Sequence, residues 1–187
     1  MRVIAGKYKK HRLKTITSNS TRPTTDQNKE NMFNLIGPYF DGGCVLDLFG
    51  GSGGLGIEAI SRGMDKLYAV DKNYQAYSVI KENIAALHME EESHIYKSDY
   101  KKALERMKQD GVKFDLVLLD PPYGKGIIQP LLVSMQEDGL LNNGCIVVCE
   151  DLREVEFEDQ YLSLVRTKTA SYGITSLHIY RMVEENE

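Results

Sequence analysis

Short apolar runs alternate with amphipathic segments along the middle of the chain, from residue 44 to residue 150. The apolar runs have the length and composition of strands buried on both faces, and the segments between them carry apolar residues at helical spacing. This alternation predicts a mostly parallel sheet with helices on both faces. We expect strands at CVLDLF, KLYAV, SHIYK, FDLVLLD and CIVVCE, and helices near residues 54–62, 73–87, 100–109 and 127–136.

The two ends of the chain do not follow this alternation. The tail contains YLSLVRTKTA and GITSLHIYRM with no helical segment between them, which predicts an antiparallel hairpin. At the start, RVIAG and RLKTI flank KYKKH and predict a short hairpin, followed by a linker rich in Ser and Thr. We therefore expect a basic hairpin and linker at residues 1–25, and one α/β domain at residues 26–187 whose first helix is capped by Thr25 or Asp26.

A glycine-rich loop, DLFGGSGGLGIEA, lies between the first strand and the first helix of the alternating region. Gly51, Gly53 and Gly56 fit the pattern G-x-G-x-x-G, in which glycines let the backbone approach a nucleotide closely. Asp71 ends the next strand, twenty residues after Gly51, where an acid commonly accepts hydrogen bonds from ribose hydroxyls. The pattern predicts a cofactor that contains a nucleoside, and the alternative is a tight turn before a helix.

Asp47 separates two possible cofactors by charge. NAD would place a pyrophosphate at the N-terminus of the following helix, and a carboxylate about 5 Å away would oppose it by about 3 kcal/mol at an effective dielectric constant near 20. S-adenosylmethionine has no phosphate and carries a sulfonium and an ammonium group, so Asp47 favours it; Asp47 could instead bond the loop. Asp99, in KSDY, is placed either to accept from an adenine amino group or to cap a helix.

The strand FDLVLLD runs into a motif that a simple turn does not require: Asp120, Pro121, Pro122 and Tyr123. The Asp120 carboxylate and the Pro121 carbonyl can accept the two N–H groups of an exocyclic amine and draw its lone pair toward a methyl donor. Proline fixes φ and adds no competing N–H, and Tyr123 can stack on a base, worth about 1–3 kcal/mol. Asp120 or bulk water would take the released proton. Gly124 and Gly126, on either side of Lys125, would leave the following loop mobile enough to close over a substrate. The alternative is a strand-ending turn with a packed tyrosine.

Positive charge is concentrated at the start of the chain. Residues 1–25 contain no acid, and removing their seven positive charges from the net charge of −4 leaves −11 for residues 26–187. A basic arm on an acidic body indicates contact with a polyanion, and the alternative is a solvated hairpin. The seven basic residues of the arm are Arg2, Lys7, Lys9, Lys10, Arg12, Lys14 and Arg22.

Together these motifs resemble those of Rossmann-like class I S-adenosylmethionine-dependent methyltransferases, whose amino-methylating branch carries DPPY. More closely, the chain resembles the RsmD-type methyltransferases, which modify the exocyclic amine (N2) of a guanine in 16S ribosomal RNA. The resemblance implies a mostly parallel sheet of seven strands, a C-terminal antiparallel hairpin and a small N-terminal hairpin. It extends over nearly the whole chain, through MRVIAGKYKKHRL, TRPTTD, MFNLI, DLFGGSGGLGIEA, VIKENI, FDLVLLDPPYG and YGITSLHIYR.

The resemblance also implies roles for individual residues. The residues implied for S-adenosylmethionine are Asp47, Phe49, Gly51, Gly53, Asp71, Lys72, Asp99 and Tyr100. The residues implied for the target amine are Asp120, Pro121, Pro122 and Tyr123. The resemblance strengthens the assignment of the basic arm, together with Lys125, to RNA, and the implied partner is ribosomal RNA or a partly assembled small subunit.

Two segments depart from what the resemblance would suggest for RNA binding. Gln27 and Asn28 stand where the family usually has a basic residue after Asp26. The acidic stretch EDLREVEFEDQ, residues 150–160, would be repelled by phosphates, so we expect it to face solvent.

Three other functions remain open. A DNA adenine-amine methyltransferase would also use DPPY, although the chain has no obvious insertion for target recognition. An RNA-binding assembly factor without catalysis would not need Asp120, Asp71 and the glycine loop, and an NAD oxidoreductase conflicts with Asp47. The cysteines and histidines show no metal-ligand spacing. No apolar run approaches the ~20 residues of a membrane span, and we expect a cytoplasmic monomer.

Overall fold

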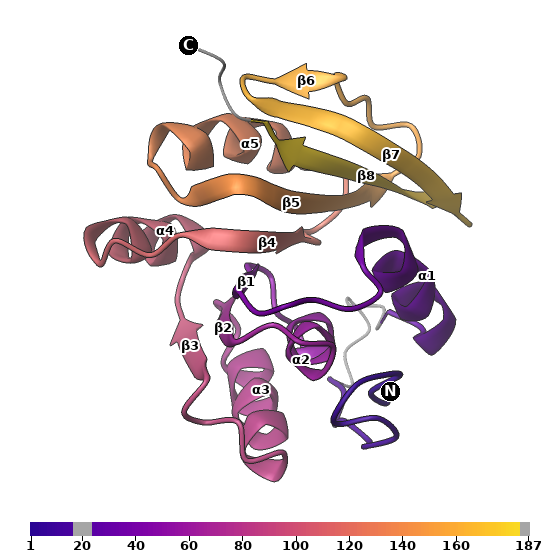
Figure 1. The fold of residues 1–187 in the computed structure, drawn as a ribbon, viewed down its shortest axis with the longest axis vertical. Helices are drawn as coiled ribbons and strands as arrows, with labels where there is room; N and C mark the ends of the chain where they lie inside the picture. Colours follow the sequence, from indigo (N-terminus) through magenta and orange to yellow (C-terminus); the bar gives the residue numbers. More distant parts are fainter. Residues whose placement is uncertain (17–23, 184–187) are drawn as a thin grey trace.

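The computed structural model describes residues 1–16 and 24–183. An eight-stranded sheet in the order β3-β2-β1-β4-β5-β8-β7-β6 forms its centre, with helices on both faces (Figure 1). The strands are β1 (Cys44–Asp47), β2 (Lys66–Asp71), β3 (Ser93–Lys97), β4 (Phe114–Leu119), β5 (Leu141–Leu152), β6 (Gln160–Tyr161), β7 (Leu164–Tyr172) and β8 (Thr175–Met182). The helices are α1 (Asp26–Ile36), α2 (Gly54–Ser61), α3 (Tyr74–Ala86), α4 (Tyr100–Gln109) and α5 (Ile128–Glu137).

Strands β1 to β5 run parallel, as the alternation predicts. At the centre β1 pairs with β2 on one side and with β4 on the other, so that Asp47 lies beside Ala69 and Leu118. The chain builds outward from β1 through β2 to β3 and then crosses back to β4. Connections that leave in opposite directions open a crevice at the carboxyl ends of the two central strands, where ligands bind in such sheets.

The sheet contains eight strands, one more than the seven predicted, and the additional strand lies in its antiparallel part. The expected C-terminal hairpin is present as β7 and β8, and β8 pairs with β5. The additional strand, β6, has only two residues and pairs with the start of β7 across a turn at Leu162 (φ 51°). Two residues carry no alternation that could mark them as a strand in the sequence.

Helices cover both faces of the sheet and bury two apolar clusters. One cluster joins α1, α2 and α3 to the sheet, with Phe33, Ile57 and Ile80 almost fully buried. The other joins α4 and α5 to it and includes the buried thiols of Cys145 and Cys149. The longest helix, α3, has 13 residues. None of the helices in the described ranges is long and apolar enough to cross a membrane.

The N-terminal segment folds back on itself as a short hairpin, as predicted, and packs on α2. Its two halves are joined by an antiparallel bridge between Arg2 and Arg12. Three backbone hydrogen bonds of 2.9 Å add to it: the amide of Val3 donates to the carbonyl of His11, Lys10 to Val3 and Leu13 to Met1. The amides of Ile4 and Ala5 instead donate to the carboxylate of Glu58, at 2.9 and 3.1 Å. Because α2 takes these two amides, the pairing between the two halves of the hairpin ends at Val3.

The acid that anchors this segment is itself buried and paired. Glu58 contacts Lys29 of α1 at 3.4 Å and Arg62 at 2.9 Å, and all three side chains are almost fully buried. The Lys29 ammonium also donates to the carbonyl of Arg2 at 2.6 Å. The network joins residues 2–5 to α1 and α2, and therefore to the edge of the crevice.

Candidate active site

A cavity of about 600 Å³ lies at the carboxyl ends of β1 to β4. Its wall combines the glycine loop, the residues that follow β2 and β3, and the segment after β4. The sequence-predicted residues on this wall are Phe49, Gly51, Asp71, Lys72, Asp99, Tyr100, Asp120, Pro121, Pro122 and Tyr123. Residues far apart in the chain are therefore gathered at one place, where the parallel sheet predicts a ligand site.

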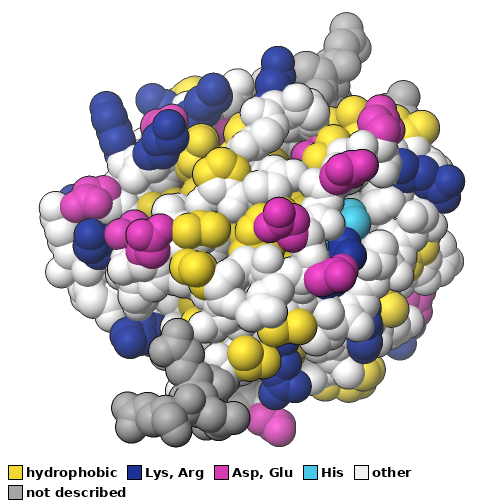
Figure 2. Space-filling model, turned by 90° about the horizontal axis from the view of Figure 1, so that it is seen from above, with side chains coloured by type: hydrophobic (Ala, Val, Ile, Leu, Met, Phe, Trp, Pro, Cys, Tyr) yellow, Lys and Arg dark blue, Asp and Glu magenta, His cyan; other side chains and the backbone are white. Residues whose placement is uncertain are grey.

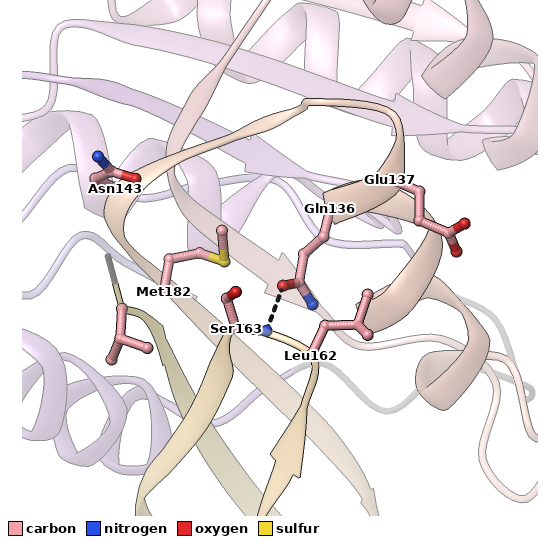
Figure 3. A pocket seen from close by; sticks show the side chains of 7 residues that line it. Gln136, Glu137, Asn143, Leu162, Ser163 and Met182 are labelled. Carbon is pink, nitrogen blue, oxygen red and sulfur yellow. Dashed lines mark hydrogen bonds between the residues drawn. The ribbon is translucent and has the colours of Figure 1, made fainter. Parts of the chain in front are cut away.

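A second hollow, of about 520 Å³, lies where the end of α5 meets the β6–β7 turn and the end of β8 (Figure 3). Gln136 accepts a hydrogen bond from the Ser163 amide at 3.0 Å, and donates to the carbonyl of Tyr161 at 2.8 Å. Glu137 is the only ionisable residue among the seven that line this hollow. It lacks the group of acids that the larger cavity holds, so the larger cavity is the candidate active site.

The glycine loop takes a backbone shape that side chains would disfavour. Gly51 and Gly53 have φ values of 59° and 83°, in the left-handed region that favours glycine. Gly56 lies one turn into α2, where a Cβ would come within 2.5 Å of the Leu67 side chain. Gly51 lies on the cavity wall, whereas Gly53 and Gly56 shape the loop and let α2 approach β2 closely.

Asp71 is fixed by two backbone amides at the end of β2. Its carboxylate accepts from Gly51 at 3.0 Å through Oδ2 and from Asn73 at 2.9 Å through Oδ1. Each carboxylate oxygen can accept a second hydrogen bond. Asp71 therefore ties the glycine loop to β2 and retains acceptor capacity on the cavity wall.

Asp99 and Tyr100 begin α4 on the same wall. The Asp99 side chain caps the helix, since its Oδ1 accepts from the amide of Lys101 at 2.8 Å. The helix-cap alternative is therefore present, and it leaves Oδ2 as a further acceptor. The rings of Phe49 and Tyr100 lie 5.3 Å apart, centroid to centroid, and supply an aromatic side to the cavity.

Asp47 lies beneath the glycine loop and does not line the cavity. It is 2% exposed, and its Oδ2 accepts from the amide of Gly56 at 3.1 Å. Burial raises the pKa of Asp47 to about 7, with the Gly56 hydrogen bond acting against this and the charge of Asp71 adding to it. The contacts of Asp47 therefore match the alternative interpretation, in which its side chain bonds the glycine loop.

Asp120 follows β4 and faces the cavity with free acceptors. Within residues 1–16 and 24–183, no hydrogen bond reaches the Asp120 carboxylate or the Pro121 carbonyl. Burial raises the pKa of Asp120 well above its usual range, and the charges of Glu150, Asp47 and Asp151 raise it further. At this point of the wall, a carboxylate and a neighbouring carbonyl are both available to accept hydrogen bonds.

Tyr123 follows these acceptors in the chain and is 36% exposed. Its hydroxyl donates to Oε1 of Glu150 at 3.5 Å. Burial raises the pKa of Tyr123, and the charges of Asp120 and Glu150 add to the effect. The ring is thus held at its hydroxyl end and open to solvent elsewhere.

The expectation that residues 150–160 face solvent is wrong for the first two acids. Asp151 is 1% exposed and accepts from the amide of Gly124 at 2.9 Å, while Glu150 is partly buried against Tyr123 and Thr175. The reason is that β5 continues to Leu152, which keeps both acids within the sheet between β4 and β8. The sequence signal that could have identified these two acids is their place at the carboxyl end of a strand that lies next to β4.

The basic residues in the described part of the arm are exposed, and the arm borders the cavity. Met1, Thr15 and Ile16 line the cavity wall. Lys9, Lys10, Arg12 and Lys125 are exposed, Arg2 pairs with Asp26 at 3.4 Å and Lys14 with Glu82 at 2.8 Å. Lys7 lies over the ring of Tyr8. Arg22 and most of the expected linker lie outside the described residues.

Another face of the molecule has no comparable separation of charge. Over the β6–β8 edge, dark blue basic and magenta acidic side chains are interspersed with yellow apolar ones (Figure 2). A polyanion would meet charges of both signs there, which makes this face a poor electrostatic match for RNA.

Fold and cavity together define a Rossmann-like class I methyltransferase. The solved structure of a protein from Escherichia coli titled as a methyltransferase, yhhF, superposes on 98% of this chain and 98% of its own with a TM-score of 0.84, at 22% sequence identity. YlbH of Bacillus subtilis strain 168, named provisionally as an rRNA methyltransferase, is 42% identical over 97% of this chain and 98% of its own. The ribosomal RNA small subunit methyltransferase D of Haemophilus influenzae is 28% identical over 97% of this chain and 93% of its own.

A family model described as conserved hypothetical protein 95 matches residues 1–181. The chain belongs to this family, which confirms the predicted RsmD-type methyltransferase. The class I fold, with its C-terminal antiparallel hairpin, is confirmed as well.

Proposed function

We propose that this protein transfers a methyl group from S-adenosylmethionine to the exocyclic amine, N2, of a guanine in small-subunit ribosomal RNA. The observation that carries the proposal is the pair of free acceptors at Asp120 and Pro121, on the wall of a cavity with nucleoside-binding features. The names of the relatives support ribosomal RNA as the substrate.

The cavity fits the proposed cofactor in size and in chemistry. A volume of about 600 Å³ lies within the range of small-molecule sites. A Cβ added at Gly51 would meet nothing within 4 Å, so the loop leaves open space for a ligand. Asp71 can accept from ribose hydroxyls, Asp99 can accept from an adenine amino group, and Phe49 and Tyr100 offer an apolar side for the adenine ring.

When bound, S-adenosylmethionine supplies an electrophilic methyl group. The chain's own part is to prepare an amine whose lone pair is delocalised into its ring. The Asp120 carboxylate accepts one N–H of that amine and the Pro121 carbonyl accepts the other, which turns the lone pair toward the methyl group. Pro121 and Pro122 have no backbone N–H. Neither position therefore supplies a donor that would compete with the amine for these two acceptors. Catalysis then comes from positioning and preorganised acceptors.

The raised pKa of Asp120 suits it to take the proton that the amine releases. A carboxylate in its ordinary range is a weak base near neutral pH, whereas a buried one beside other acids binds a proton more readily. We propose that the proton moves to an Asp120 oxygen once the methyl group has been transferred.

We propose that the basic arm binds the RNA backbone and that Lys125 adds a contact beside Tyr123. The arm borders the cavity through Met1, Thr15 and Ile16, so phosphates held there would lie near the base that enters. We also propose that the enzyme acts as a monomer in the cytoplasm, where ribosomal RNA is made.

The test offers radiolabelled S-adenosylmethionine to the protein with naked small-subunit RNA, with isolated small subunits and with DNA of matched length. We expect label in RNA, in the naked or the assembled form, and none in DNA. Label on DNA adenine with none on RNA would overturn the proposal, and label on no substrate would favour an assembly factor without catalysis.

A further inference from the structure

We propose that Glu150 and Asp151, adjacent acids near the end of β5, are positioning residues that hold the loop carrying Tyr123 ready for the target base. The inference rests on the proposed function, because it concerns the same loop and the same base. It adds two residues that neither the DPPY motif nor the cofactor loop contains.

Asp151 restrains the backbone of this loop. Its Oδ1 accepts from the amide of Gly124 at 2.9 Å and from the amide of Leu152 at 2.8 Å. The side chain is 1% exposed, and a hydrogen bond to a charged, buried acceptor is among the stronger ones in proteins. Gly124 directly follows Tyr123 and has a φ of 71°, so the loop is tied where its backbone turns.

Glu150 restrains the ring of Tyr123. Its Oε1 lies 3.5 Å from the Tyr123 hydroxyl and 3.3 Å from the hydroxyl of Thr175 on β8. Thr175 pairs with Leu152 across the sheet, so the acid is bracketed by β8 on one side and the loop on the other. A ring held at its hydroxyl end keeps its face free to stack on a base.

The two restraints act on different parts of one loop. Asp151 fixes where the backbone runs, and Glu150 fixes where the ring points. Ordering both before the substrate arrives removes part of the conformational entropy that base binding would otherwise lose. The charges of Glu150 and Asp151 beside Asp120 are electrostatically unfavourable, while both acids accept hydrogen bonds from the loop.

The first test needs no substrate. Hydrogen–deuterium exchange of a peptide covering residues 120–127 reports whether the Gly124 amide is protected. We expect protection in the wild-type protein, faster exchange in Asp151→Ala, and protection retained in Asp151→Asn, which keeps an acceptor oxygen. Glu154→Ala, an exposed acid three residues further along, is the matched control and should exchange as the wild type does. Equal exchange in Asp151→Ala and the wild type would overturn the role of Asp151.

The second test is a double-mutant cycle on Glu150→Ala and Tyr123→Phe, read as kcat/KM for RNA at saturating cofactor. We expect each single variant to lose about three- to tenfold, the size of one hydrogen bond, and the double variant to lose no more than either. Glu150→Gln keeps an acceptor for the hydroxyl and should recover most of the loss. Losses that multiply in the double variant would show that Glu150 does not act through Tyr123.

The outcomes separate this inference from the proposed function. Wild-type protein that methylates no RNA would defeat the proposed function, while the exchange experiment would still test the loop restraint. Active wild-type protein with multiplying losses and an unprotected Gly124 amide would defeat the inference alone. Cofactor affinity, measured by calorimetry on each variant, should match the wild-type value, and a shared loss of affinity would mean that the acids support the whole cavity rather than the loop.

Discussion

The acids in the two halves of the cavity differ in their hydrogen bonding. In the cofactor half, beyond β2 and β3, Asp71 and Asp99 already accept hydrogen bonds from backbone amides. In the amine half, beyond β4, the Asp120 carboxylate and the Pro121 carbonyl have no partner in the described residues. We propose that the first half holds the cofactor with groups that the fold has already ordered, and that the second half is completed by a substrate that brings its own N–H groups.

The largest effect is expected from a substitution that alters the amine half of the cavity alone. Asp120→Ala removes one of two acceptors for the target amine, and a preorganised contact of this kind is worth about 10²–10³-fold in rate. We expect single-turnover methyl transfer to fall by about that factor while the cofactor dissociation constant, measured by calorimetry, stays nearly unchanged. If cofactor affinity fell as far as the rate, Asp120 would belong to the cofactor half.

The converse change breaks the cofactor half. Asp71→Ala removes the carboxylate that we assign to the ribose and that also anchors Gly51. Hydrogen bonds to a charged group contribute about 1.5–3 kcal/mol each, so cofactor affinity should fall by about 10- to 100-fold. Raising the cofactor concentration should restore much of the methyl-transfer rate. A rate that stayed low at saturation would contradict the division between the halves.

A third change tests the region outside both halves. Replacing Lys9, Lys10 and Arg12 together by alanine should flatten the dependence of RNA affinity on salt, by about 0.7–0.9 in slope for each phosphate that the arm no longer neutralises. Binding measured between low and moderate salt gives the slope directly. Glu154→Ala serves as a charge-changing control, and an unchanged slope in the triple variant would remove the arm from the RNA-binding surface.

The smallest effect concerns Asp47, which lies between the halves. Its pKa of about 7, raised from 3.8, means that the folded state binds a proton more tightly than the unfolded state does. Stability should therefore fall as pH rises from about 4 to 7. Asp47→Asn keeps an acceptor for the Gly56 amide without a buried charge.

We expect the Asp47→Asn variant, without ligand, to melt several degrees above the wild type at pH 8, at about 2–4 °C per kcal/mol. The two proteins should melt alike near pH 3, where Asp47 is largely protonated in both the folded and the unfolded state. A lower melting temperature for the variant at pH 8 would mean that the Asp47 charge is compensated by its surroundings.

Much of this arrangement could be predicted from the sequence, because its signals are local. The alternation of strands and helices fixes which residues end at the crevice, and both Asp71 and Asp120 lie where their strand ends imply. The first helix begins after Thr25, whose hydroxyl accepts from the Asn28 amide. Strand ends and caps depend on neighbours in the chain, so the sequence carries them.

Features that depend on distant partners could not be predicted in the same way. The pairing of the N-terminal hairpin ends at Val3 because Glu58, more than fifty residues away, takes the next two amides. Asp151 lies inside because β5 is longer than its apolar run and because Gly124 offers it an amide. A prediction from composition assigns an acidic stretch to solvent because it takes no account of individual contacts such as these.

The most direct test of the central claim is the identity of the methylated atom. Small-subunit RNA labelled by the wild-type protein is digested to nucleosides, and the labelled nucleoside is identified by mass spectrometry against synthetic standards. Two acceptors at Asp120 and Pro121 fit an exocyclic amine with two N–H groups, and the proposed guanine target makes N2-methylguanosine the expected product. A methyl group on a ring nitrogen, a ring carbon or a ribose oxygen would contradict it.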